Sequence, residues 1–297
     1  MEGFEAFDEI CIPVGDGRLV GRLAVTPGAP VLLLLHGHPQ THLIWHELAG
    51  PLAERFTVVA LDLPGYGVSR ASTRGPTAQT KRVMASDLDD AMRVLGERHG
   101  FDRYAVLAHD RGARVTHRLL LDRPHRVTRA MFLDIAPTLD MYDGTTRGYA
   151  TAYWHWFFLI QPEPLPERLI SADPDAYVDA TMGTGPRGLE VFAPAALAAY
   201  RAALRDPDVV HAMCEDYRAS AGPDLELDRA DRHAGRLVTA PLRVLWGAHG
   251  VVERFFDPLA LWSAVAADVS GRSLECGHYV PEEVPQALLA EVLDFFG

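Results

Sequence analysis

The stretch "VLAHDRGARVTH" (residues 106–117) joins a short apolar run directly to an amphipathic segment. The apolar run predicts a buried strand and the segment after it predicts a helix, so Asp110 falls at the sharp turn between them. Such a unit presents its turn residue at the carboxyl edge of the sheet, where open α/β sheets bind their ligands. The question is what a carboxylate does there with Arg111 and Arg114 beside it.

The rest of the chain shows what kind of sheet contains this unit. Short apolar runs alternate with amphipathic segments, and the runs from residue 31 onward are almost wholly apolar, as in parallel strands covered on both faces. This alternation predicts a mostly parallel, doubly wound α/β sheet. Strands are expected at 9–14, 17–25, 31–36, 57–62, 104–109, 129–134, 242–247 and 273–276, and helices at 80–99, 112–122, 255–267 and 282–296.

The alternation stops for about a hundred residues in the second half of the chain. Residues 140–235 are rich in Ala, Tyr, Trp and Pro, with helix-like segments and no convincing strand. We therefore expect one sheet domain, formed by residues 1–139 and 236–297, with a helical cap inserted at 140–235.

Composition excludes several classes of partner. A formal net charge of -12 argues against nucleic acid or an anionic membrane, so an anionic substrate would need positive charge concentrated locally. No apolar run approaches the length of a membrane span, and the acidic N-terminus lacks the apolar core of a secretory signal. Three scattered cysteines do not suggest a disulfide framework. The cytoplasm is the simplest expected location.

Asp110 has two interpretations from its position alone. Asp is favoured before a helix simply as an N-cap, whatever the function. The alternative is a nucleophile elbow, in which the turn residue attacks the substrate. One residue departs from the elbow pattern, because Ala108 stands where a glycine is usual two residues before the nucleophile.

A base and an acid are expected on later loops of the same sheet edge. His278, in "ECGHYVPEE" (275–283), follows the last expected strand, where this architecture places its general base. A lone histidine is more often a packing residue, so the inference depends on its combination with Asp110. For the acid, Asp134 ends the strand 129–134, whereas the loop after 242–247 offers only His249 and, further on, Glu253. We therefore expect Asp134 to orient His278.

The segment "HGHPQTHLIW" (36–45) follows a strong expected strand. Its glycine permits close approach of the backbone, and the amide of His38 can pair with that of Arg111 as an oxyanion hole. Its histidines raise the possibility of a metal site, but no HExxH pattern, carboxylate or cysteine completes one. We expect no metal and no cofactor. The later "DLPGYGVS" (62–69) lacks the lysine and spacing of a phosphate loop and predicts a tight turn.

Together these motifs resemble the α/β-hydrolase superfamily over nearly the whole chain. "HDRGAR" at the elbow is similar to the haloacetate (fluoroacetate) dehalogenases, as are "YWHWFFL" (153–159) and "CEDYRAS" (214–220) in the inserted region. The resemblance also suggests a homodimer. It implies Asp110 as nucleophile with Asp134 and His278 completing the triad, Arg111 and Arg114 as carboxylate binders, and His155, Trp156 and Tyr217 as halide binders.

The chemistry of a halogenated carbon explains a carboxylate nucleophile. A serine attacking a saturated carbon would give an ether that water does not readily cleave, whereas Asp110 would give an ester that His278-activated water can hydrolyse. A haloacid is itself an anion, and two unit charges at about 4 Å repel by roughly 4 kcal/mol at an effective dielectric of 20. Guanidinium groups offset that repulsion and orient the substrate. The first hypothesis is therefore hydrolysis of a short 2-haloacid, such as fluoroacetate, to a 2-hydroxy acid.

Two other functions remain open from the sequence. An epoxide hydrolase also uses an aspartate and a histidine, but it would place cap tyrosines on the epoxide oxygen and has no need of two carboxylate-binding arginines. A ligand receptor on a decayed hydrolase fold is the non-enzymatic alternative. Such proteins usually lose the base or the acid, whereas Asp110, Asp134 and His278 are all present.

Overall fold

The computed structural model describes residues 3–73, 75, 77–185 and 187–297. Within these residues the strands form one eight-stranded sheet in the order β1-β2-β4-β3-β5-β6-β7-β8. The two N-terminal strands run antiparallel to their neighbours, and every pairing from β4 to β8 is parallel. The predicted α/β fold with a mostly parallel sheet is therefore confirmed.

The central strands carry the apolar runs that the sequence shows. All residues of β3, β4 and β5 are buried, because helices cover both faces of the sheet. The strands are β1 (Asp8–Val14), β2 (Gly17–Ala24), β3 (Val31–Leu35), β4 (Thr57–Leu61), β5 (Tyr104–His109), β6 (Val127–Leu133), β7 (Leu242–Gly247) and β8 (Val269–Leu274).

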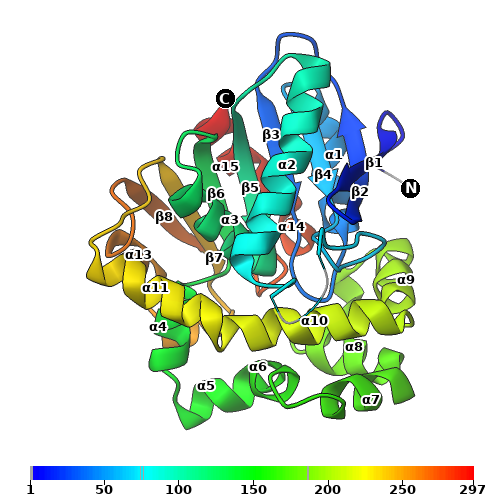
Figure 1. Cartoon of the computed structure of the whole chain (residues 1–297), viewed down its shortest axis with the longest axis vertical. Coiled ribbons are helices and arrows are strands. Elements are labelled where there is room, and N and C mark those ends of the chain that lie inside the picture. The colour runs from blue at the N-terminus through cyan, green and yellow to red at the C-terminus, as the bar shows by residue number, and fades with distance from the viewer. Residues whose placement is uncertain (1–2, 74, 76, 186) are drawn as a thin grey trace.

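Helices of the sheet domain lie on both sides of the strands. In Figure 1, α2 and α3 lie in front of the sheet, and α1 and α15 lie behind it. These helices bury their apolar stripes against the strands. The elements are the 3-10 helix η1 (His42–Trp45), α1 (His46–Ala53), α2 (Lys81–His99), α3 (Asp110–Asp122), α12 (Val251–Phe255), α13 (Pro258–Ser263), α14 (Val280–Glu283) and α15 (Pro285–Phe296).

The inserted segment folds as a helical cap at one end of the sheet. Figure 1 shows α5 to α10 gathered below the strands, with α10 and α11 running across the end of the sheet domain. In the described residues between β6 and β7 no strand occurs. The cap elements are α4 (Thr138–Asp143), α5 (Arg147–Ala152), α6 (Trp154–Leu159), α7 (Leu165–Ala172), α8 (Pro174–Met182), η2 (Gly188–Val191), α9 (Pro194–Ala203), α10 (Pro207–Ser220) and α11 (Pro223–His233).

The structure differs from the sequence predictions mainly near the C-terminus. The last strand begins at Val269, four residues before the predicted 273–276, because β8 is an edge strand whose side chains are mostly half-buried or exposed. The predicted helix 255–267 is two short helices, separated by extended backbone at Phe256. The predicted helix 282–296 is likewise divided, with Pro285 opening α15.

Among the described residues, no helix combines the length and the apolar character that a membrane crossing requires.

Candidate active site

Asp110 lies at the sharp turn where β5 ends and α3 begins. Its φ angle is +42°, a left-handed conformation that Asp and Asn adopt more readily than other non-glycine residues. The backbone of Gly37, in the loop after β3, packs against this turn. A Cβ added at Gly37 would lie 2.5 Å from the Cβ of Asp110. This close approach brings the amide of His38 to the carboxylate, and its N–H donates to Asp110 Oδ2 at 3.0 Å. The turn after β5 therefore sets the direction in which the Asp110 side chain leaves the backbone, and the loop after β3 supplies the donor that faces it.

Asp134 and His278 meet although 144 residues separate them. The Nδ1 atom of His278 lies 2.5 Å from Asp134 Oδ2, and the amide of Gly247 donates to Asp134 Oδ1 at 2.9 Å. Asp134 also has a positive φ, +51°, which turns its side chain out of the end of β6. Neither of the two residues that the segment after β7 offers contacts His278 in place of Asp134. His249 is paired with Glu275, and Glu253 accepts the indole N–H of Trp246.

Charges in this site oppose the effect of burial on two groups. Burial would raise the pKa of Asp110, but His278, Arg114, His109 and Arg111 outweigh it and hold the pKa well below its ordinary value. Burial would lower the pKa of His278, but the hydrogen bond and charge of Asp134, with the charge of Asp110, raise it above its ordinary value. In the free site, Asp110 is therefore a carboxylate and His278 carries a strengthened affinity for a proton.

Arg111 is held by the cap and not by the sheet domain. Its Nε and Nη2 atoms donate to the two carboxylate oxygens of Asp216 at 2.8 and 2.7 Å, and Nη2 also donates to Ser220 Oγ at 2.6 Å. Its Nη1 atom is buried and has no hydrogen-bond partner in the described part of the chain. Within the described chain, one nitrogen of the Arg111 guanidinium is therefore free to donate to a ligand.

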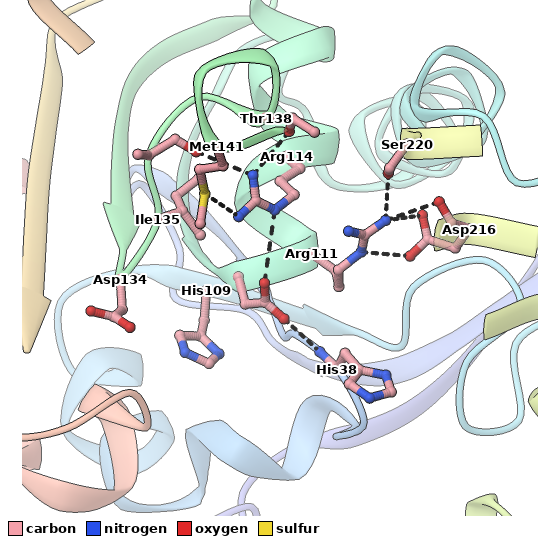
Figure 2. A network of polar contacts seen from close by, with 12 residues as sticks. His38, His109, Arg111, Arg114, Asp134, Ile135, Thr138, Met141, Asp216 and Ser220 are labelled. Carbon is pink, nitrogen blue, oxygen red and sulfur yellow. Dashed lines mark hydrogen bonds and ion pairs between the residues drawn. The ribbon is translucent and has the colours of Figure 1, made fainter. Parts of the chain in front are cut away.

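Arg114 is held by neutral groups. Its Nη1 atom donates to the carbonyl of Ala136 at 3.1 Å and to Thr138 Oγ1 at 2.9 Å, and its Nη2 atom contacts the sulfur of Met141. Figure 2 shows the two arginines diverging from α3, with Arg111 toward Asp216 and Ser220 and Arg114 toward Thr138 and Met141. The buried Nε of Arg114 makes no hydrogen bond to a described residue and lies 3.8 Å from Asp110 Oδ1.

The three predicted halide binders lie close to one another in the cap. The rings of His155 and Trp156 lie 6.0 and 6.2 Å from that of Tyr217. Burial lowers the pKa of His155 to about 3, so its imidazole is neutral and has one N–H to donate. The buried hydroxyl of Tyr217 finds no hydrogen-bond partner among the described residues.

A cavity of about 80 Å³ separates the cap from the sheet domain at this point. Asp110, His38 and His278 line it from the sheet domain, and His155 and Trp156 line it from the cap. This volume suits a ligand of a few non-hydrogen atoms. Five of the predicted site residues line this cavity: His38, Asp110, His155, Trp156 and His278. The other four, Arg111, Arg114, Asp134 and Tyr217, are not among its lining residues.

The sequence assigned no role to three residues that lie at this site. His109 is buried beside Asp110, and its Nε2 lies 2.9 Å from the carbonyl oxygen of His278. Tyr153 lines the cavity with a hydroxyl that has no partner in the described chain. Asp216 lies in the motif 214–220, but its pairing with Arg111 joins positions 105 residues apart. A local pattern carries no signal for such a contact.

The histidines after β3 have structural partners. His36 Nδ1 lies 2.8 Å from the carbonyl of Gly37, and its Nε2 accepts from the amide of Leu63. His42 pairs with Asp62 at 2.8 Å. Across the described ranges, no three His, Cys, Asp or Glu side chains gather as metal ligands would.

Glu282 is a buried carboxyl of α14 that contacts Gln40 of the loop after β3 and Tyr200 of the cap helix α9. Gln40 Nε2 lies 2.6 Å from one of its oxygens, and the hydroxyl of Tyr200 donates to the other. Burial raises the pKa of Glu282 from 4.5 to about 8, against both hydrogen bonds. Rotation of the Gln40 amide would let the protonated carboxyl donate to Oε1 of Gln40, which has no partner among the described residues.

We expect this carboxyl to make stability depend on pH. A raised folded-state pKa favours the folded chain at low pH, so stability falls as pH rises from 4.5 to about 8, by at most about 5 kcal/mol. Glu282→Gln should melt near the wild-type temperature at pH 5 and above it at pH 8.5. Glu54→Gln, which changes an exposed carboxyl, should keep the wild-type profile. Parallel melting curves for wild type and Glu282→Gln across this range would contradict the prediction.

Comparisons with known proteins place the chain in a family. The family model of the alpha/beta hydrolase fold matches residues 30–180. A fluoroacetate dehalogenase of Burkholderia sp. is 40% identical over 95% of this chain and 91% of its own. A soluble epoxide hydrolase of Corynebacterium sp. (strain C12) is 32% identical over 89% of each chain. A solved structure from Nostoc sp. PCC 7120, assigned to the α/β hydrolases, is 46% identical with a TM-score of 0.92 and covers 99% of both chains.

The chain therefore belongs to the α/β hydrolase family and is a hydrolase. The family resemblance inferred from "HDRGAR" is confirmed by the fluoroacetate dehalogenase relative.

Proposed function

We propose that this hydrolase cleaves the carbon–halogen bond of short 2-haloacids, giving 2-hydroxy acids. The observation that carries the proposal is the pair of arginines on α3. Arg111 Nη1 and Arg114 Nε are buried cationic donors without hydrogen-bond partners among the described residues, and both arginines lie beside Asp110. A buried unpaired donor is costly, and a substrate carboxylate would satisfy both.

In the first step, the Asp110 carboxylate attacks the carbon that bears the halogen. A new carbon–oxygen bond forms, the carbon–halogen bond breaks with its electron pair, and halide leaves. His155, Trp156 and Tyr217 offer an imidazole N–H, an indole N–H and a phenol O–H to the leaving halide. The lowered pKa of Asp110 keeps the nucleophile ionised, at the cost of some intrinsic nucleophilicity.

In the second step, water attacks the carbonyl carbon of the Asp110 ester, and His278 accepts the proton. The bond between that carbon and the substrate oxygen then breaks, the 2-hydroxy acid leaves with the proton returned by His278, and the Asp110 carboxylate is restored. Ester formation removes the negative charge of Asp110, which is one of the causes of the raised pKa of His278. The proton affinity of His278 therefore falls at the stage where it must act as a neutral base. The amide of His38, already 3.0 Å from Asp110 Oδ2, can stabilise the oxyanion together with the amide of Arg111.

Epoxide hydrolysis is the second candidate, because the cap also presents free phenols. The hydroxyls of Tyr153 and Tyr217 are buried and lack partners within the described chain, and either can donate to an epoxide oxygen. The 32% identical epoxide hydrolase supports this alternative. It leaves the two arginines without a role, which is why we prefer the haloacid.

A substrate panel separates the two candidates. We expect halide release from chloroacetate and fluoroacetate, measured with a halide electrode, and much slower release from bromoethane, which has no carboxylate. Diol formation from styrene oxide should be negligible. Turnover of bromoethane equal to that of chloroacetate, or faster turnover of styrene oxide, would contradict the proposal.

Arg114→Gln should lower kcat/KM for chloroacetate by about 100-fold or more, because a buried charge-assisted contact to the substrate is lost. Arg118→Gln is the matched control, since Arg118 lies one turn further along α3 and binds Asp122, Asp228 and Asp231. The control should lower the melting temperature while kcat/KM stays within a few-fold of wild type. Equal losses of kcat/KM in both variants would show that Arg114 acts only through stability.

A further inference from the structure

A buried group of four charges joins the cap to the sheet domain behind the active site. Arg111 of α3 and Lys81 of α2 face Asp216 of α10 and Asp224 of α11. All four side chains are almost completely buried. We call these residues the Asp216 cluster.

Asp216 is the centre of this cluster. One carboxylate oxygen accepts from Arg111 Nη2 at 2.7 Å and from the ammonium of Lys81. The other accepts from Arg111 Nε at 2.8 Å and from the hydroxyl of Tyr66 at 2.7 Å. Four donors on two oxygens leave the carboxylate no freedom to turn, and the bidentate contact fixes the plane of the guanidinium.

The contacts of the Asp216 cluster leave Arg111 with a single guanidinium nitrogen for a ligand. The edge formed by Nε and Nη2 is fully used, and the Tyr217 ring lies 4.1 Å from the central carbon of the guanidinium. Among the guanidinium nitrogens, only Nη1 has no hydrogen-bond partner in the described chain. Asp216 compensates the charge of Arg111. Arg111 therefore acts on a substrate mainly as a hydrogen-bond donor of fixed direction, and less as a source of positive potential.

Arg114 has the opposite character. Its hydrogen-bond partners are a carbonyl, a hydroxyl and a thioether, none of them charged. Its one ion pair within the described chain is with the nucleophile Asp110, at 3.8 Å. The positive charge that attracts an anion to the site is therefore mainly that of Arg114.

We propose that Asp216 is a positioning residue that determines specificity for carboxylate substrates, by fixing Arg111 so that Nη1 alone meets the substrate. This inference rests on the proposed haloacid function. It gives the two arginines different roles. Arg114 attracts the anion, and Arg111, which the cap holds in place, binds only a substrate whose carboxylate is placed to accept from Nη1. The carboxylate site is complete only when α10 is docked on the sheet domain.

A purely structural role for Asp216 makes a different prediction. A second bridge from the cap to the sheet domain exists at the start of α10, where Asp206 pairs with Arg70 at 2.6 Å. If Asp216 only docked the cap, then its loss and the loss of Asp206 would affect kcat and KM in the same pattern.

The test compares Asp216→Asn with Asp206→Asn by chloride release from chloroacetate. We expect Asp216→Asn to raise KM roughly 10- to 100-fold with a much smaller change in kcat, because one charge-assisted partner of Arg111 is lost. Asp206→Asn should keep both constants within about twofold of wild type. Ser220→Ala, which removes only the 2.6 Å hydrogen bond to Nη2, should raise KM in the same direction by a few-fold.

Four outcomes would overturn the inference. An unchanged KM in Asp216→Asn with wild-type turnover would leave the haloacid function standing and remove the positioning role. A fall in kcat without a rise in KM would do the same. If Asp216→Asn does not fold, Ser220→Ala decides, and an unchanged KM there rejects the role. If the wild-type chain releases no chloride from chloroacetate, the haloacid function fails and the inference fails with it.

Discussion

Asp110→Asn is expected to abolish halide release, with a loss of at least about 10⁴-fold in kcat. An amide is a poor nucleophile at saturated carbon, so no ester forms. Asn is the appropriate replacement because it tolerates the left-handed φ of +42° and keeps the size of the side chain. Halide release from chloroacetate, followed over hours, is the measurement.

Two controls make this result decisive. Asp122→Asn, at the other end of α3, tests the effect of the same substitution on the helix and should retain turnover. Slow recovery of activity in Asp110→Asn must coincide with a mass gain at position 110, which marks deamidation back to the carboxylate. Sustained wild-type turnover while the introduced amide stays intact would exclude Asp110 as the nucleophile.

His278→Asn is expected to stop turnover after one chemical step and to trap the ester on Asp110. The first step does not need His278, whereas the second needs it as a base to activate water. His278 Nδ1 is engaged by Asp134 at 2.5 Å, which leaves Nε2 as the ring nitrogen for the water. Mass spectrometry should show a protein heavier by one carboxymethyl group after incubation with chloroacetate, together with one equivalent of chloride.

The adduct must map to the peptide that contains Asp110. A double variant, Asp110→Asn with His278→Asn, should form no adduct, which distinguishes the ester from alkylation of a cysteine such as the exposed Cys11. Full loss of chloride release without any adduct would contradict a two-step mechanism.

The sheet domain could be predicted closely because its signals are local. The apolar runs at β3, β4 and β5 are fully buried strands, and the turn at Asp110 falls between β5 and α3 as expected. The prediction was wrong at β8, where an edge strand has no continuous apolar run to reveal it. Helix boundaries after β7 were also wrong, because extended residues and Pro285 interrupt a periodicity that looks continuous.

The sequence by itself determined where the candidate reacting groups lie in the fold. It placed Asp110 at a turn, put Asp134 and His278 at the ends of later strands, and set Arg111 and Arg114 near one another on one helix. These features follow from spacing along a single element or from the common carboxyl edge of parallel strands. Local rules therefore suffice to find them.

Only the tertiary structure decided how the arginines are used. Arg111 is paired with Asp216 across 105 residues, and Arg114 with neutral groups of the segment after β6. The cap has no fixed register relative to the sheet until its helices pack, so the partner of each guanidinium depends on that packing. Which charge is compensated, and which donor stays free for a substrate, is therefore a property of the folded chain.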